Sequence, residues 1–115
     1  MSVNILVADD DPAMLHLYTL VFSGTDYSIS MASSFAEAEK LIGANSYDLL
    51  VADLMLGDGL GTELIALFEK KRCGAKSLLV SGSVAELDLE PLPETYIEKP
   101  FRVEVFLSAV AKALS

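Results

Sequence analysis

The sequence has few of the features that would cross-link the chain or place it in a membrane. It contains one cysteine, Cys73, which cannot form an internal disulfide and which we interpret as a reduced apolar residue without a catalytic role. No apolar run reaches the roughly 18 residues that a membrane-spanning helix needs, and residues 1–4 lack the basic start of a secretory signal. We therefore expect a cytoplasmic protein that does not insert into membranes.

Basic residues are also scarce. Eight lysines and arginines stand against 17 acidic residues, which gives a formal net charge of −9. A molecule with this charge repels nucleic acid and anionic lipid, so direct binding to nucleic acid is not expected. The basic cluster at residues 70–72 precedes Gly74, and we interpret it as the end of a helix, where cations offset the helix dipole.

Hydrophobic residues, in contrast, are abundant. They make up 52% of the 115 residues and occur along the whole length, interrupted by glycine, aspartate and serine clusters. This composition is typical of a packed globule, and the length suits one domain. Without any linker, repeat or low-complexity segment, the sequence predicts a single domain over residues 1–115.

Strand and helix signals alternate along the chain. Short apolar or alternating runs indicate strands, and apolar residues three and four apart indicate helices. Strands that alternate with helices require right-handed crossovers, which place the strands in one parallel sheet with helices on both faces. The predicted fold is α/β, a three-layer doubly wound (flavodoxin-like) five-stranded parallel sheet. Strands are expected at residues 3–8, 27–31, 48–53, 77–81 and 95–98, and helices at 12–23, 35–44, 60–72 and 103–114.

Two of the predicted helices carry signals for their first residues. Asp11 can cap the first helix, and Pro12 suits its first position. Ser34 and Glu37 have the spacing of a capping box at the start of the second helix. Residues 27–31 alternate with serines, which indicates that the strand between these helices lies near an edge of the sheet.

Polar residues stand where four of the five predicted strands end. Asp9 and Asp10 follow the first strand, Asp53 ends the third, Ser81 ends the fourth, and Lys99 follows the fifth. Doubly wound sheets bind their ligands outside the carboxyl ends of the strands. These five residues are therefore expected to converge at one edge of the sheet.

The chemistry of these residue types indicates phosphoryl transfer at a metal site. Three neighbouring carboxylates repel one another unless a cation is present, and oxygen ligands without histidine or cysteine favour Mg²⁺ when a phosphate oxygen completes the site. An aspartate can attack phosphorus to form an acyl phosphate if cations neutralise the transferring group. We expect Asp53 to be this nucleophile, with Lys99 and Ser81 contacting phosphoryl oxygens.

Four motifs together make the chain resemble the response-regulator receiver domains of bacterial two-component signalling, over essentially its whole length. They are ILVADDDP, VADLMLGDGLG, LLVSG and YIEKPF, in this order. The resemblance implies that Asp9 and Asp10 hold Mg²⁺ together with Asp53, the phosphoacceptor, and that Met55 offers its backbone carbonyl to the metal. It further implies a cytoplasmic signalling phosphoprotein rather than an enzyme, one that catalyses phosphoryl transfer only to its own Asp53 and loses the group slowly.

The resemblance also implies a switch and a set of partners. Ser81 and Lys99 would sense the phosphoryl group, and Tyr96 would rotate inward, which shifts an equilibrium between two surface shapes. A cis peptide bond between Lys99 and Pro100 is implied as well. The phosphoryl donor would be a histidine kinase, a His phosphotransfer protein or a small phosphodonor, and a downstream protein would read the altered surface.

The chain departs from the family pattern in two places. Gly57 stands where relatives usually have proline, which loosens that loop without removing a ligand. Residues 82–95 hold Pro91 and Pro93 where relatives have a full helix, so the fourth helix is predicted to be shortened, to about residues 83–89, or absent. We hypothesise that this short acidic segment prevents the dimer that many receivers form through it; the oligomeric state is not predicted.

Other functions fit the sequence less well. Asp9 and Asp11 match the start of haloacid-dehalogenase phosphohydrolases, but Ala13 stands where that motif has threonine or valine. A receiver-like module that binds partners without phosphorylation stays open, whereas the acidic first loop disfavours a flavin phosphate. No output domain follows Ser115, so we expect either a stand-alone regulator or a part of a longer regulator or hybrid kinase.

Overall fold

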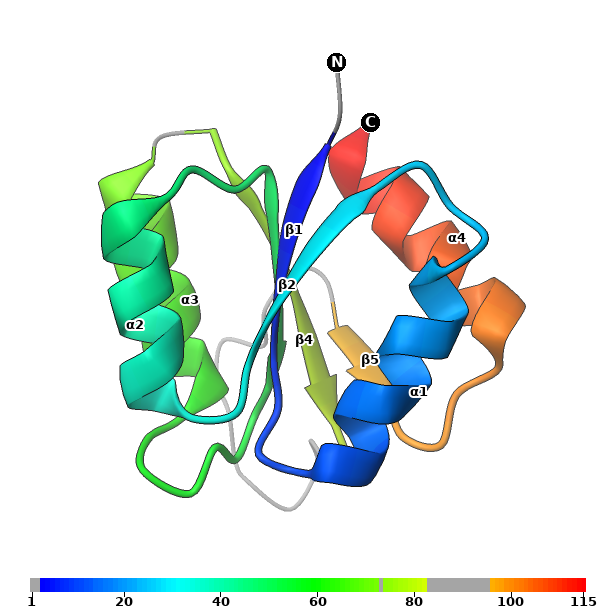
Figure 1. Ribbon diagram of the computed structural model, residues 1–115, viewed down its shortest axis with the longest axis horizontal. Helices are drawn as coiled ribbons and strands as arrows, with labels where there is room; N and C mark the ends of the chain where they lie inside the picture. Colours follow the sequence, from blue (N-terminus) through cyan, green and yellow to red (C-terminus); the bar gives the residue numbers. More distant parts are fainter. Residues whose placement is uncertain (1–2, 73, 83–95) are drawn as a thin grey trace.

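A computed structural model describes residues 3–72, 74–82 and 96–115. This part of the chain contains five strands and four helices. The strands form a single parallel sheet in the order β2-β1-β3-β4-β5, and the helices cover both of its faces (Figure 1). This confirms the predicted flavodoxin-like α/β fold. The elements are β1 (Asn4–Ala8), α1 (Pro12–Phe22), β2 (Ser28–Ala32), α2 (Phe35–Ala44), β3 (Leu49–Asp53), α3 (Gly61–Lys71), β4 (Lys76–Ser81), β5 (Tyr96–Glu98) and α4 (Val103–Leu114).

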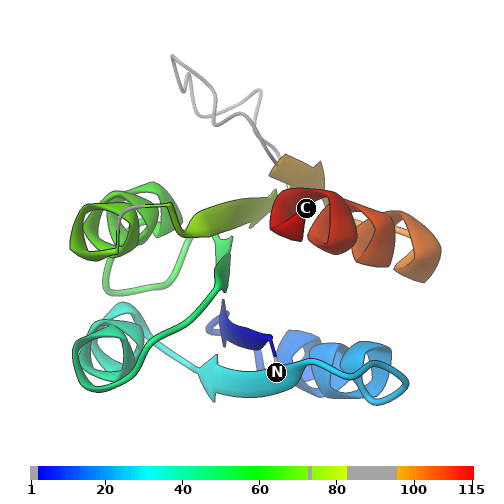
Figure 2. The same ribbon diagram turned by 90° about the horizontal axis from the view of Figure 1, so that it is seen from above.

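The sheet lies between two layers of helices. Viewed from above, α2 and α3 cover one face, and α1 and α4 cover the other (Figure 2). Successive side chains of a strand point to opposite faces, so Ile5 and Val7 of β1 pack toward α1 and α4, whereas Leu6 and Ala8 pack toward α2 and α3. The sheet therefore divides the core into two hydrophobic clusters, one for each helical layer.

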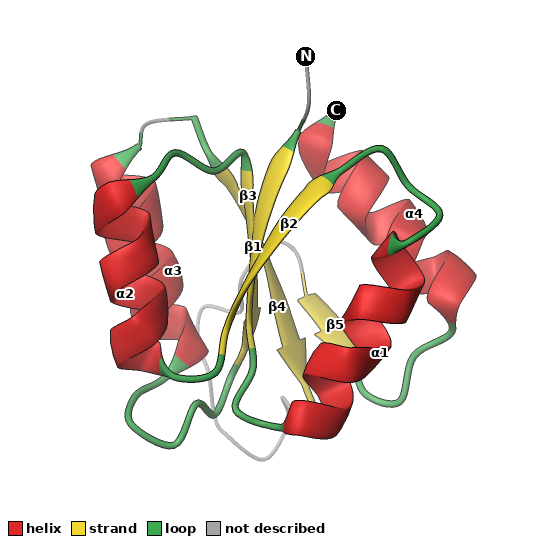
Figure 3. Cartoon of the chain, in the orientation of Figure 1, coloured by secondary structure: helices red, strands yellow, loops and turns green. Residues whose placement is uncertain are grey.

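The three inner strands are buried on both sides, as their continuous apolar sequences predict. In β1 and β3, residues 5–8 and 49–52 are at most 1% exposed. The predicted edge position of β2 is also confirmed, since it pairs only with β1 and is partly exposed at most of its positions. Figure 3 shows that every strand points its carboxyl end toward the same edge of the sheet.

The predicted helix starts are confirmed in most respects. The Asp11 carboxylate accepts a hydrogen bond from the Ala13 amide at 2.9 Å, with proline at the first position of α1. The Ser34 hydroxyl accepts from the Glu37 amide at 3.1 Å. The Glu37 carboxylate, however, accepts from the amide of Ser33 at 2.6 Å, one residue earlier than a capping box requires. Only half of that predicted motif is therefore formed.

The basic cluster at the end of α3 does more than offset the helix dipole. The Lys71 ammonium donates to the Ile42 carbonyl at 2.6 Å, and the Arg72 guanidinium bonds the Tyr47 carbonyl and forms an ion pair with Asp48 at 3.1 Å. These contacts tie the end of α3 to the end of α2 and to the segment that leads into β3. The interpretation as a simple helix end was therefore incomplete.

Some predictions concern residues outside the described ranges. The shortened or absent fourth helix and the dimer hypothesis both fall on residues 83–95, and Cys73 also lies outside, so these stay predictions. The helix labelled α4 is the one predicted at residues 103–114. The peptide bond between Lys99 and Pro100 is cis, as the resemblance implied. Among the described residues, no helix has the length and apolar character needed to cross a membrane.

Candidate functional site

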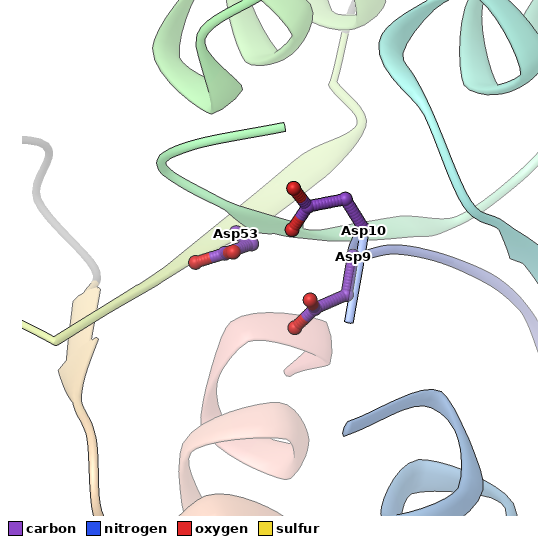
Figure 4. A group of neighbouring side chains, drawn as sticks. All are labelled: Asp9, Asp10 and Asp53. Carbon is purple, nitrogen blue, oxygen red and sulfur yellow. The ribbon is translucent and has the colours of Figure 1, made fainter. Parts of the chain in front are cut away.

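Three carboxylates meet at the carboxyl edge of the sheet. Ala8 of β1 pairs with Ala52 of β3, so Asp9 and Asp53 come next on neighbouring parallel strands. One carboxylate oxygen from each of Asp9, Asp10 and Asp53 lies within 4.8 Å of the others. Figure 4 shows the three side chains extending toward the same side of the strand ends. The predicted convergence of these residues is thus present in the structure.

Lys99 brings a positive charge into this acidic group. β5 pairs with the end of β4, and the Lys99 amide donates to the Ser81 carbonyl at 2.7 Å, which places the side chain next to the carboxylates. Its ammonium lies 3.3 Å from Asp9 Oδ2 and 3.4 Å from Asp53 Oδ1. One ammonium thus pairs with two of the three carboxylates, and the site retains a surplus of negative charge.

Asp9 and Asp10 differ in their surroundings. The Asp9 side chain is 0% exposed, and besides its ion pair with Lys99 it accepts a hydrogen bond from the Asp11 amide at 2.9 Å. A charge buried this deeply is tolerated because it is paired and hydrogen-bonded. Asp10, in contrast, is exposed. Asp9 therefore lies at the buried side of the site, and Asp10 lies at its solvent-exposed side.

The pKa of Asp53 is raised from 3.8 to about 6. Burial is the largest cause, the charge of Asp9 adds to it, and Lys99 works in the opposite direction. Because the ionised form of Asp53 is disfavoured, a nearby divalent cation would stabilise it. Three carboxylates without a histidine or cysteine among them are a donor set that suits a hard ion such as Mg²⁺, so the residues present fit the metal implied by the sequence.

The raised pKa of Asp53 leads to a prediction about stability. Because the folded-state value lies above the unfolded one, protonated Asp53 stabilises the fold at low pH, and this contribution is lost as the pH rises from about 4 through about 6. Asp53→Asn removes the charge, so we expect it to raise the free energy of unfolding by about 2 kcal/mol at pH 7.5 without divalent ions. Urea unfolding at pH 7.5 and 4.5 measures this. A gain of equal size at both pH values would contradict the assignment.

The other predicted site residues lie on the neighbouring strands β4 and β5 and in the loop after Asp53. Ser81 ends β4 and is buried, at 3% exposure. Tyr96 begins β5 and is 43% exposed, and Met55 follows Asp53 in the loop and is 54% exposed. Their placement agrees with the predicted roles in phosphate sensing, switching and metal binding, but the roles themselves stay predictions.

The loop after Asp53 contains residues whose importance the sequence analysis missed. A Cβ atom on Gly61 would lie 2.1 Å from the Asp53 carbonyl oxygen, so the backbone of α3 passes directly against Asp53. Asp58 accepts hydrogen bonds from two amides at the start of α2, and these bonds hold the pKa of its carboxyl below the usual range. The glycine-rich sequence indicated a loop, but nothing local in it signalled a bond to a helix 23 residues earlier.

The chain is similar to one known protein family and to several curated proteins. The family model of the response regulator receiver domain matches residues 5–111. The chain is 36% identical, over 115 residues, to the alginate biosynthesis transcriptional regulatory protein AlgB of Pseudomonas putida, and 25% identical, over 115 residues, to the transcriptional regulatory protein GlrR of Escherichia coli K12. Each match covers 96% of this chain and 26% of the relative. The chain thus spans about a quarter of the length of these relatives.

Solved structures agree with the family match. The structure is similar to a CheY-like receiver domain from Methanospirillum hungatei, with a TM-score of 0.89, 27% identity and coverage of 99% of this chain and 94% of the other. It is also similar to the non-phosphorylated HemR receiver domain of Leptospira biflexa, with a TM-score of 0.84, 27% identity and coverage of 99% and 95%. The fold, the group of three carboxylates and the match to the family model all indicate the same family. This chain belongs to the response regulator receiver domain family of two-component signalling.

Proposed function

We propose that the chain is a phosphoryl-accepting signalling switch, which receives a phosphoryl group on Asp53 and alters its interaction surface. The donor would be a histidine kinase, a His phosphotransfer protein or a small phosphodonor. The observation that carries this proposal is the group of three carboxylates within 4.8 Å, with the ammonium of Lys99 at 3.4 Å from Asp53. A downstream protein would bind the altered surface.

The reaction needs an aspartate nucleophile and neutralisation of charge. A carboxylate oxygen of Asp53 forms a bond to phosphorus, the bond from phosphorus to the donor atom breaks, and the leaving group keeps the electron pair. Asp9, Asp10, Asp53 and the Met55 carbonyl would hold Mg²⁺. When bound, this ion supplies neutralisation of the charge on the transferring group. In this proposal the phosphoryl group stays on Asp53 after the transfer, so the chain is not an ordinary turnover enzyme.

Lys99 would exchange one of its two ion-pair partners during the transfer. In the structure its ammonium bonds both Asp9 and Asp53. Once Asp53 becomes an acyl phosphate, the ammonium would pair with a phosphoryl oxygen, while Asp9 continues to hold it in the site. Ser81, buried at the end of the neighbouring strand, would donate its hydroxyl proton to another phosphoryl oxygen.

The proposed switch links the site to the surface. Tyr96 lies on the edge strand β5, two positions before the end that leads to Lys99, and its side chain is 43% exposed. An inward rotation of this ring would follow the movement of Ser81 toward the phosphoryl group. The phosphoryl group would shift the equilibrium between the two surface shapes because it contacts Ser81 in one shape and not in the other.

Intact-mass spectrometry after incubation with acetyl phosphate tests the proposal. We expect a single phosphoryl adduct when Mg²⁺ is present and no adduct when EDTA is added to the reaction. Asp53→Asn should form no adduct, because it lacks the nucleophile. Asp26→Asn, which changes an exposed aspartate outside the site, should be modified like the native chain. No adduct under any condition would favour a phosphorylation-independent binding module. Sustained turnover of a small phosphate ester, faster than the phosphoryl group is lost from Asp53, would favour a phosphohydrolase.

A further inference from the structure

The loop between β3 and α3 is fastened to α2 by one carboxylate. Asp58 Oδ1 accepts from the Phe35 amide at 2.7 Å, and Oδ2 accepts from the Ala36 amide at 3.0 Å. These are the first two amides of α2, and the third, that of Glu37, is taken by the Ser34 hydroxyl. Helix amides at these positions have no partner within their own helix. Asp58 therefore completes the N-terminus of α2 from a distant part of the chain.

A packing contact strengthens this connection. A Cβ atom on Gly59 would lie 2.6 Å from the ring of Phe35, so the ring packs directly on the glycine backbone. The Leu56 amide donates to the Gly59 carbonyl at 3.0 Å, which closes the turn between them. We call the bidentate bond of Asp58 and the contact of Gly59 the α2 latch. It holds the loop by both polar and apolar contacts.

The latched turn is also the part of the loop that faces the acidic group. Met55 forms an antiparallel bridge with Leu60, so the two sides of the turn are joined. Gly57, at the tip, has φ +81, and a Cβ atom there would lie 3.4 Å from Asp10 Oδ2. A glycine in this conformation adds backbone freedom, so the position of the turn depends on contacts made elsewhere. The α2 latch provides those contacts.

We propose that Asp58 is a positioning residue for the metal site: by fixing the turn to α2, it holds the Gly57 backbone beside Asp10 and orients the Met55 carbonyl before the ion binds. This rests on the proposed function, in which Met55 is a ligand. Groups that orient metal ligands lower the cost of ordering them on binding, and their removal weakens metal affinity. Asp58 itself would not touch the ion.

Isothermal titration calorimetry with Mg²⁺ and the native chain tests this inference without requiring phosphorylation. We expect Asp58→Ala to raise the dissociation constant about 10-fold, at the lower end of the effects known for such supporting residues. Asp58→Asn should raise it less, because the amide oxygen still accepts one hydrogen bond. In parallel, phosphorylation by acetyl phosphate should need more Mg²⁺ in both variants but reach the native rate at saturation.

Glu63→Gln is the matched control, because it removes the same charge from an exposed residue in the first turn of α3, outside the latch. An unchanged dissociation constant in a folded Asp58→Ala variant would overturn the inference, and so would an equal loss in Glu63→Gln and Asp58→Asn. If Asp58→Ala fails to fold by circular dichroism, Asp58→Asn decides. If the native chain binds Mg²⁺ but accepts no phosphoryl group, the proposed function fails while the comparison of affinities still decides the role of Asp58. A native chain that binds no Mg²⁺ would overturn both.

Discussion

Gly61→Ala is expected to lower the free energy of unfolding by about 3 kcal/mol, because the added methyl group has no space. Its Cβ would lie 2.1 Å from the Asp53 carbonyl oxygen, 2.9 Å from the Asp53 carbonyl carbon and 3.1 Å from Leu54 Cα. All three atoms belong to the backbone and cannot move aside as a side chain can. The Gly61 amide also donates to the Leu54 carbonyl at 2.7 Å, so separating the two segments would lengthen this bond.

Urea unfolding of Gly61→Ala should be compared with that of Gly43→Ala. Gly43 also lies in a helix, and its nearest neighbour for a new Cβ is the Lys71 ammonium at 3.9 Å. Alanine has the higher helix propensity, so this control should be stabilised by up to about 1 kcal/mol. A Gly61→Ala variant as stable as the native chain would show that the backbone around Asp53 moves more freely than this close approach implies.

Lys99→Met is expected to cost about 3 kcal/mol of stability at pH 7.5 in the absence of divalent ions. The Asp9 carboxylate, 0% exposed, would lose its cation and remain buried with one hydrogen bond. The pKa of Asp53 would rise further, because Lys99 is the group that lowers it. Asp53 of the variant is therefore protonated at a higher pH than in the native chain, which relieves part of the repulsion, so the loss should shrink as the pH falls toward about 6 and stay constant below it.

Urea unfolding with and without Mg²⁺ measures this effect. Added Mg²⁺ should restore part of the lost stability, because a bound cation replaces the charge of the lysine. Asp9→Asn introduced into Lys99→Met should also recover stability, which a double-mutant cycle would show as coupling between the two residues. Lys40→Met, which changes an exposed lysine of α2, is the control. A loss of stability that does not depend on pH or on Mg²⁺ would contradict this account.

The sheet and the carboxylate group could be predicted because they follow from short-range patterns and one topological rule. Continuous apolar runs identify the inner strands, and parallel strands bring their carboxyl ends together. Once Val3–Ala8 and Asp48–Asp53 were assigned as parallel strands, the proximity of Asp9 and Asp53 followed. These two strands begin one residue later than predicted, for example at Leu49 instead of Asp48, because the ends of a strand depend on its pairing and not on its composition.

Contacts between segments far apart in the sequence could not be predicted in this way. The bonds of Asp58 to the start of α2 join residues 22 and 23 positions apart, and no local pattern marks either partner. The same holds for the contacts of Tyr18 in α1. Its ring stacks on Phe101 at 6.3 Å, and burial together with the charges of Asp9 and Asp53 raises its pKa. Which rings meet depends on the packing of α1 against the segment after β5.

Because the sheet separates the core into two clusters, we expect the two helical layers to open independently of each other. Amide hydrogens of α2 and α3 should then exchange with solvent through one local opening and those of α1 and α4 through another, while the buried strands β1 and β3 exchange only on global unfolding. Asp58 joins the loop after Asp53 to the layer of α2 and α3. An ion held by that loop and by Asp9 and Asp10 would therefore slow hydrogen exchange in α2 and α3, through Asp58, and also at the start of α1, which follows Asp10.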